Sequence, residues 1–65
     1  MMRSVYVFCA DGFEEVEGLT AVDLLRRAGV SVTMVSIMGR TKITGARNIS
    51  VNTDILIEDI KEEAD

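Results

Sequence analysis

The sequence predicts an α/β protein, and more narrowly the opening strand–helix–strand unit of a doubly wound parallel sheet. Three observations lead to this prediction: an apolar β-prone run near the N-terminus, a helical segment after it, and a second β-prone run that ends at Ile37. The 65 residues are 48% hydrophobic and only 5% aromatic, which indicates an aliphatic core. Because a domain of this length buries only about 60% of its unfolded surface, so much aliphatic content requires further partner surface. We therefore interpret residues 1–65 as one segment of a single domain, with the remainder of that domain absent from this chain.

The first strand is predicted over Ser4–Ala10, a continuous apolar run of the kind that is buried on both faces of a parallel sheet. Asp11-Gly12 ends this run. Asp11 followed by Glu14 fits a helix N-cap with an acidic residue at the third helical position, a variant of the capping box. The chain is therefore expected to enter a helix directly after the first strand.

The helix is predicted over Phe13–Ala28, about four turns by the period of the α-helix. Asp23 can pair with Arg27 one turn later, and Arg26 and Arg27 stand where the helix C-terminus favours cations. Gly29 is a natural end for such a helix.

The second strand is predicted over Val30–Ile37, parallel to the first because a helix connects the two. A turn follows at Met38–Arg40, and Thr41–Val51 carries β-prone pieces around a glycine that favour a small hairpin or an edge extension of the sheet. Asp54–Glu63 is predicted to form a short helix capped by Asp54, and residues 62–65 an acidic, solvated end. On this interpretation the chain stops before any third strand of the parallel sheet.

Composition excludes several classes of function. The chain has 7 Lys and Arg against 11 Asp and Glu, a net charge of -4 at pH 7, which argues against a nucleic-acid partner. With no histidine and one cysteine it holds neither the usual structural zinc set nor an internal disulfide, so we expect no metal. Cys9 lies inside the first apolar run and is predicted to be a buried, unreactive thiol. Gly12 and Gly18 lack the spacing of a dinucleotide-binding motif, so we expect no cofactor. No apolar run is long enough to span a membrane and no secretory leader is evident.

Glu17 breaks the amphipathic pattern of the predicted helix. On a wheel of about 100° per residue it falls among Phe13, Ala21 and Leu24, in the middle of the most apolar face. A carboxyl group that points into a core must find a partner or become protonated. It also lies in the first turns after the first strand, where doubly wound sheets bind ligands. Glu17 is therefore a candidate functional residue, the alternative being that its side chain reaches solvent at the helix start.

Four runs of residues carry a resemblance to a known family, namely Gly12-Phe13-Glu14-Glu15-Val16-Glu17, Asp23-Leu24-Leu25-Arg26-Arg27-Ala28-Gly29, Thr44-Gly45-Ala46-Arg47-Asn48-Ile49 and Asp54-Ile55-Leu56-Ile57-Glu58-Asp59. Together they resemble the start of the ThiJ/PfpI superfamily, the DJ-1-like proteins. The most similar branch holds the protein deglycases and the bacterial relatives named for thiazole monophosphate biosynthesis. The resemblance covers almost the whole chain but only the front third of the family's domain. It implies a flavodoxin-like sheet of the class I glutamine amidotransferase type.

The resemblance implies three site residues. In the family, the glutamate at the position of Glu17 is the protonated partner of a reactive cysteine that lies later in the domain, outside this chain. Arg27 and Arg47 are implied to lie near the site or the dimer contact, where the planar, multiply donating guanidinium group binds anions. The alternative for both arginines is a surface position, with Arg27 paired to Asp23.

The resemblance also implies partners. The family's first helix contributes to a homodimer, and Leu19 and Val22, on the polar side of the wheel, suit such a contact. The alternative is that other parts of the same domain cover these two residues. The remainder of the domain is expected as a separate chain, produced by cleavage or a break after Asp65. The expected compartment is the cytoplasm, which fits the single cysteine.

The leading hypothesis is the N-terminal part of a cysteine-dependent enzyme or stress protein that acts on small reactive carbonyl or acyl compounds, as a glyoxalase III or deglycase. This chain alone lacks the nucleophile, so we expect it to be inactive by itself. A second hypothesis is a flavodoxin-like binding or signalling module in which Asp11, Glu14 and Glu15 hold magnesium. A third is an inactive structural fragment. Family membership fixes a fold better than it fixes a reaction.

Overall fold

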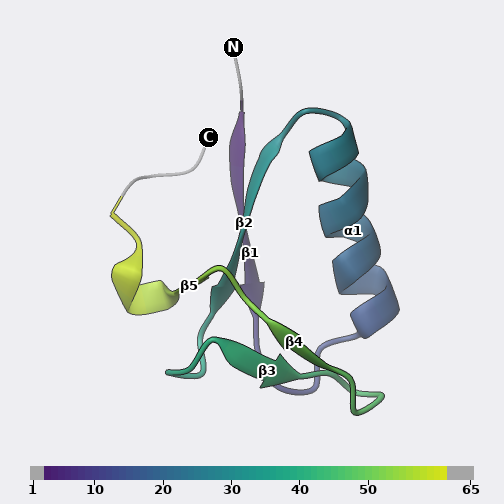
Figure 1. Cartoon of the computed structure of the whole chain (residues 1–65), viewed down its shortest axis with the longest axis vertical. Coiled ribbons are helices and arrows are strands. Elements are labelled where there is room, and N and C mark those ends of the chain that lie inside the picture. Colours follow the sequence, from purple (N-terminus) through teal and green to yellow (C-terminus); the bar gives the residue numbers. More distant parts are fainter. Residues whose placement is uncertain (1–2, 62–65) are drawn as a thin grey trace.

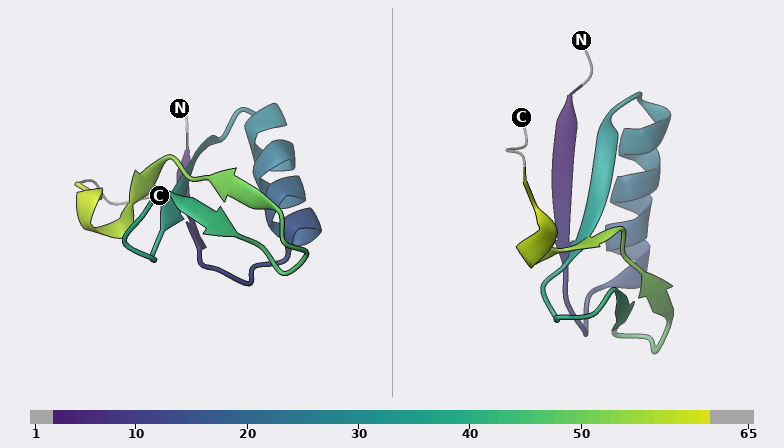
Figure 2. Two further views of the ribbon diagram at one scale, coloured as in Figure 1. Left: turned by 60° about the horizontal axis from the view of Figure 1, so that its bottom comes forward. Right: turned by 60° about the vertical axis from the view of Figure 1, so that its left-hand side comes forward.

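The computed structural model describes residues 3–61 and confirms the predicted α/β class (Figure 1). In chain order its elements are β1 (Ser4–Cys9), α1 (Glu15–Arg27), β2 (Ser31–Ser36), β3 (Lys42–Thr44), β4 (Ser50–Asn52), β5 (Ile55–Leu56) and the 3-10 helix η1 (Ile57–Asp59). Figure 2 shows α1 on one side of the parallel strands and the β3–β4 hairpin across the end at which β1 and β2 finish. Within residues 3–61, no helix has the length and apolar composition needed to cross a membrane.

The parallel sheet has the strand order β1-β2-β5. β1 and β2 pair in parallel from Ser4 opposite Ser31 onward, which confirms the predicted strand–helix–strand unit. β5 pairs in parallel with the other edge of β2, where Ile55 lies opposite Val35. The expectation that the chain stops before any third parallel strand is therefore wrong. Within the described residues β1 has a strand neighbour on one side only, and Phe8 is 55% exposed rather than buried.

α1 begins later than predicted, at Glu15 rather than Phe13, and the predicted capping box is absent. Glu14 occupies the N-cap position and its side chain makes no capping hydrogen bond. The Asp11 carboxylate instead accepts a hydrogen bond from the backbone N–H of Thr44 at 3.0 Å. The capping interaction is lost because a long-range partner on β3 takes the acceptor that the local pattern assigned to the helix.

The prediction of a helix over Asp54–Glu63 is also wrong. Its first residues are extended and form β5, and only the single 3-10 turn η1 follows. The Asp54 carboxylate caps no helix: it accepts from the N–H of Met34 at 2.7 Å and from Nη2 of Arg26 at 3.0 Å. Pairing with the edge of β2 thus outweighs the local helical preference. The predicted acidic, solvated end at residues 62–65 lies outside the described residues.

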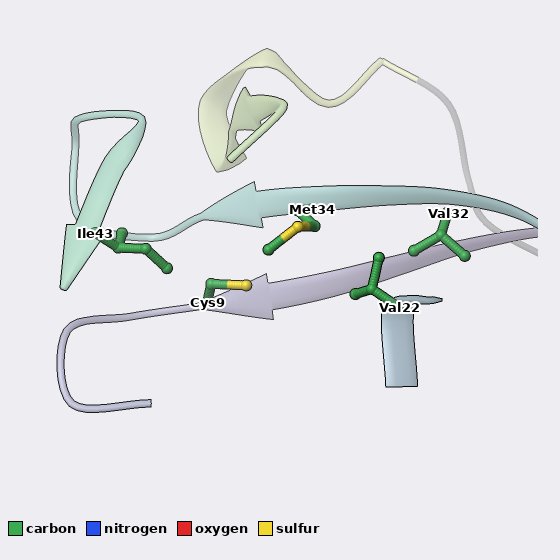
Figure 3. Close-up of a cluster of buried hydrophobic side chains, with 5 residues drawn as sticks. All are labelled: Cys9, Val22, Val32, Met34 and Ile43. Carbon is green, nitrogen blue, oxygen red and sulfur yellow. The ribbon is translucent and has the colours of Figure 1, made fainter. Parts of the chain in front are cut away.

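The core lies between α1, the two long strands and the hairpin, and Figure 3 shows its buried members, Cys9, Val22, Val32, Met34 and Ile43. Val22 is 5% exposed, and Leu19 and Leu25 pack against the same cluster. Other parts of the same domain therefore cover Val22 and partly cover Leu19, which is the alternative to a contact with a second copy. The large apolar residues of α1 that face outward are Val16 and Leu24, which are 76% and 59% exposed.

Candidate functional site

The β1–α1 connection, residues 10–14, lies where β1 and β2 end, the place at which doubly wound sheets bind ligands (Figure 1). Gly12 turns the chain there with φ of 89°, a conformation that favours glycine. Its N–H donates to the Thr44 carbonyl at 2.8 Å, and the Phe13 N–H donates to the Ala10 carbonyl at 3.2 Å. The connection is thus held to β3 by the Gly12 hydrogen bond and closed on itself by the hydrogen bond between Phe13 and Ala10.

An open pocket of about 400 Å³ lies beside this connection. It is lined by Val7, Phe8, Cys9, Phe13, Glu14, Glu17 and Gly18, which come from the end of β1, the connection and the first turn of α1. Gly18 admits the ring of Phe13: a Cβ at position 18 would stand 3.2 Å from a ring carbon. The absence of a side chain at Gly18 therefore lets Phe13 pack against the helix as part of the pocket lining, which also includes the acidic residues Glu14 and Glu17.

Glu17 borders this pocket with an exposed side chain, so the prediction that it points into the core is wrong. The wheel set its apolar face by Phe13, which precedes the helix, and by Leu24, which is 59% exposed. The sheet lies instead against the face that carries Val22 and Leu25. Glu17 consequently lines the pocket with a side chain that is exposed to solvent.

Glu15 is the buried carboxyl group of α1, with 3% of its surface exposed. Its Oε2 accepts hydrogen bonds from the backbone N–H groups of Arg47 at 2.9 Å and Ile49 at 3.1 Å. Its Oε1 lies 3.1 Å from the same Arg47 nitrogen. Glu15 thereby fastens the turn between β3 and β4 to the start of α1. Sequence reasoning missed this role, although Glu15 stands two residues before Glu17 in the motif that carried the family resemblance.

These contacts shift the ionisation of Glu15. Burial raises the pKa of the carboxyl group, but its own backbone N–H, the N–H groups of Ile49 and Arg47, and the charge of Arg47 outweigh burial. The net result is a pKa below the ordinary value, because the ionised form accepts these hydrogen bonds best. Glu15 is therefore held as a carboxylate, suited to fastening backbone rather than to donating a proton.

The two predicted arginines lie at different ends of α1. Arg47 belongs to the β3–β4 turn that Glu15 holds at the start of the helix, and its side chain is exposed. Arg27 lies in the last turn of the helix and pairs with Asp23, Nε to Oδ1, at 3.2 Å. The structure thus brings Arg47, but not Arg27, close to the helix start that carries Glu17.

Asp11 forms a second link between the β1–α1 connection and the segment after β2. Its Oδ2 pairs with Arg40, and its Oδ1 accepts from the N–H of Thr44. The Thr44 hydrogen bond has the largest effect and lowers the pKa of Asp11. Desolvation, the next largest effect, opposes it, and the hydrogen bond and charge of Arg40 lower the pKa further, so that the net pKa lies below the ordinary value. The carboxylates of Asp11 and Glu15 already accept hydrogen bonds from backbone N–H groups of β3 and of the β3–β4 turn. The structure therefore offers no support for a magnesium site built on these two residues. Within residues 3–61 no three acidic, cysteine or histidine side chains are grouped to hold a metal ion.

Cys9 is 4% exposed, as the sequence predicts, and its thiol donates to the Val7 carbonyl at 3.5 Å. Burial, with a smaller contribution from the negative charge of Asp54, raises the pKa of this thiol above 9.0. The neutral thiol is a poor nucleophile, so any cysteine chemistry at the pocket requires a different residue.

The comparison with protein families matches residues 3–65 to the DJ-1/PfpI family. Among curated proteins, the chain is similar to Protein dj-1beta of Drosophila melanogaster, with 32% identity over 63 residues (97% of this chain, 34% of the relative). It is similar also to the Parkinson disease protein 7 homolog of Danio rerio, with 33% identity over 61 residues (94% of this chain, 32% of the relative). The chain thus spans about a third of the length of the curated relatives it matches.

Solved structures give the same result for the fold. A DJ-1 superfamily protein from Salmonella typhimurium superposes with a TM-score of 0.86 at 28% identity, covering 89% of this chain and 31% of that one. DJ-1 from Toxoplasma gondii, in an oxidized form, superposes with a TM-score of 0.84 at 34% identity, covering 86% and 30%. The described residues therefore have the fold of the N-terminal part of this flavodoxin-like domain.

Proposed function

The chain belongs to the DJ-1/PfpI family, and we propose that it is the N-terminal part of a cysteine-dependent enzyme of that family that acts on small reactive carbonyl compounds. The branch we assign is that of the protein deglycases and the relatives named for thiazole monophosphate biosynthesis. The assignment rests on the motif that spans Gly12 to Glu17 and on the arginine pair at the end of α1. Methylglyoxal is the substrate that represents this class.

One observation carries the proposal: Glu17 borders an open pocket at the end of β1, in the position that the family resemblance gives to the partner of the catalytic cysteine. An exposed carboxyl group on a pocket can meet a thiol brought by the remainder of the domain, whereas a carboxyl group inside the core cannot. The neighbouring Phe13 and Val7 give the pocket an apolar wall suited to a small carbonyl compound.

The proposed chemistry needs one nucleophile and one proton carrier. The thiolate of a cysteine outside this chain adds to the aldehyde carbon of methylglyoxal, so that a C–S bond forms while the C=O π electrons move to oxygen. The Glu17 carboxyl group passes a proton to that oxygen, giving a hemithioacetal. Transfer of the aldehyde hydrogen with its electron pair to the ketone carbon turns the hemithioacetal into a thioester of lactate, so the aldehyde carbon is oxidised, the ketone carbon is reduced and no external oxidant is needed. One water then attacks the thioester carbonyl, which breaks the C–S bond and releases lactate and the cysteine thiolate. Of the two protons released, one returns to Glu17 and the other goes to solvent.

The remaining parts of the proposal concern partners. Arg47 and Arg27 bind anionic groups at the site or at a dimer contact, and the protein is a cytoplasmic homodimer. Because Leu19 and Val22 pack in the core, we assign the α1 part of the dimer contact to Val16 and Leu24, whose side chains are exposed. The remainder of the domain is proposed to be a separate chain.

The activity test uses the complete native domain, meaning these 65 residues together with the rest of the domain. Methylglyoxal consumption is compared for the wild type, Glu17→Gln and Glu58→Gln, the last being an exposed glutamate of η1. We expect Glu17→Gln to lower kcat/KM by about 100-fold or more, the usual size of general acid–base catalysis, and Glu58→Gln to leave it unchanged. Equal activity of Glu17→Gln and the wild type would remove Glu17 from the mechanism, and an inactive wild type would favour a binding module or a structural fragment.

Chain organisation is tested by a denaturing intact-mass spectrum of the same native material. A second component of about 110 to 130 residues, enough to complete one typical domain, is the expected result. A single 7.1 kDa mass would contradict the two-chain proposal, and so would a single covalent species of whole-domain mass.

A further inference from the structure

The β3–β4 turn, residues 45–49, is held to α1 by hydrogen bonds to Glu15, in addition to the hydrogen bonds within the hairpin. Within the turn, the Asn48 N–H donates to the Gly45 carbonyl at 3.0 Å, and the Gly45 N–H donates to the Ile49 carbonyl at 2.9 Å. Asn48 has φ of 65°, in the left-handed region. The backbone N–H groups of Arg47 and Ile49 take no part in these two bonds, and both donate to the Glu15 carboxylate.

Gly45 makes room for that carboxylate. A Cβ built at position 45 would overlap the Cδ and Oε2 of Glu15, so any other residue there must displace the Glu15 side chain. Gly45 does not lie at positive φ, so its backbone is one that alanine adopts without strain. The glycine is thus required by a close approach of a side chain rather than by its conformation.

Arg47 is left with its backbone fixed and its guanidinium group unpaired. Arg26, Arg27 and Arg40 each form an ion pair with a carboxylate. Across the part of the chain that the structure describes, the Arg47 side chain forms no such pair, and the hydrogen bonds between Arg47 and Glu15 come from the Arg47 backbone N–H. An exposed guanidinium group on an anchored turn is suited to binding a carboxylate from outside.

We infer that Glu15 and Gly45 form one positioning unit, which holds the 45–49 turn so that Arg47 binds the carboxylate of an anionic carbonyl substrate at the end of α1 that carries Glu17. This inference rests on the proposed function, since Arg47 has a role only if that site acts on small carbonyl compounds. Glu15 is a positioning residue: it acts on substrate through Arg47 and does not touch the reacting atoms.

The unit itself is tested without any substrate. Hydrogen exchange of the Arg47 and Ile49 amides is measured in the complete native domain for the wild type, Glu15→Ala, Gly45→Ala, the double variant and Glu58→Ala as control. We expect Glu15→Ala and Gly45→Ala each to lower the protection of both amides about tenfold or more, the size of one hydrogen bond to a charged group. Adding Gly45→Ala to Glu15→Ala should then have no further effect, because the side chain that the new Cβ would strike is gone. Additive losses in the double variant, or unchanged protection in Glu15→Ala, would overturn the positioning unit.

The consequence for substrate is tested with dioxovalerate, an α-ketoaldehyde that carries a carboxylate, and methylglyoxal, an α-ketoaldehyde that does not. We expect Arg47→Ala and Glu15→Ala to raise KM for dioxovalerate about tenfold while changing KM for methylglyoxal little. In the Arg47→Ala background, Glu15→Ala should add nothing further for dioxovalerate. Equal effects on both substrates would show a structural role only and overturn the assignment of Arg47. A wild type that turns over neither compound would end the proposed function, whereas the exchange measurements would still decide the positioning unit.

Discussion

Two carboxylates connect the first half of the molecule to the hairpin, and both do so through backbone N–H groups. Asp11 accepts from Thr44 at the end of β3, and Glu15 accepts from Arg47 and Ile49 in the turn. Both have a pKa below the ordinary value because the ionised form is the better acceptor. Ionisation of these two carboxyl groups therefore increases the free energy of unfolding.

Acid is expected to weaken this connection. A carboxyl group whose folded pKa is lowered contributes stability above its unfolded pKa and loses it as the pH falls through the folded pKa. The free energy of unfolding should therefore fall as the pH drops below about 4.5, the ordinary value for Glu15. Urea titrations between pH 7 and 3 measure this slope, which should be shallower in Glu15→Gln and unchanged in Glu58→Gln. A Glu15→Gln slope equal to that of the wild type would contradict the role of Glu15.

Cys9 is expected to react slowly with iodoacetamide at pH 8. Burial raises the pKa of its thiol above 9.0 and also limits access of the reagent, because only 4% of the surface of Cys9 is exposed. The alkylation rate in the native domain should be at least about tenfold lower than in guanidinium chloride, and mass spectrometry of the peptide that contains Cys9 measures both. Equal rates would mean that β1 opens to solvent in the native state.

Among the elements, α1 is the one whose orientation decides what each of its residues does. Its buried face carries Glu15, Val22 and the half-buried Leu19 and Leu25, so one face contributes both to the core and to the contact with the hairpin. The opposite face presents Glu17 to the pocket. A rotation of the helix by half a turn, as the wheel suggested, would exchange these roles.

Truncation of Val22 tests this orientation. We expect Val22→Ala to lower the free energy of unfolding by about 2 kcal/mol, since it removes buried methyl groups from the core. Thr20→Ala, at an exposed position of the same helix, should change it by less than about 0.5 kcal/mol. Chemical denaturation of the two variants gives the comparison, and similar losses for both would contradict the observed face.

Asp54 ties the segment before β5 to β2 and to α1. Its carboxylate accepts from the Met34 N–H and from Arg26, and Arg26 also donates to the Val32 carbonyl at 2.9 Å. Asp54→Ala should therefore cost about 1–2 kcal/mol of unfolding free energy, whereas Asp23→Ala, which breaks only an exposed pair within α1, should cost about 0.5 kcal/mol or less. Thermal unfolding of both variants measures the difference. An equal cost would show that the Asp54 contacts add nothing beyond an exposed pair.

At the scale of the whole molecule, the exposed residues on the outer face of α1 concern assembly. Leu24→Arg should raise the dissociation constant of the proposed homodimer about tenfold or more, because a charge replaces an apolar side chain at the contact. Analytical ultracentrifugation of the native domain over a range of concentrations measures this, with Glu58→Arg on η1 as the control. An unchanged dissociation constant would remove α1 from the dimer contact.

The order of β1, α1 and β2, and the parallel pairing of the two strands, could be predicted because apolar runs and turn residues are local signals. The third strand, β5, could not, because it forms only by pairing with the edge of β2. The buried face of α1 could not, because apolar residues occupy both faces and the position of the sheet selects one of them. Glu15 was missed because its partners Arg47 and Ile49 lie 32 and 34 residues away in sequence. Asp54 was misassigned for the same reason: a capping pattern is local, whereas its acceptor role at Met34 arises only once β5 has paired.

The all-parallel order of the β1-β2-β5 sheet has a consequence for how fast the chain folds. Neither of its two strand pairs is closed by a tight turn, so each must wait for a long loop to close before its hydrogen bonds form. The β3–β4 hairpin is a local pairing and is expected to close first, on the microsecond scale of such hairpins. The slow step then belongs to the meeting of β1 with β2, and substitutions there should retard refolding. Because the hairpin is already formed when β1 meets β2, destabilising changes in its turn should also slow refolding rather than accelerate unfolding.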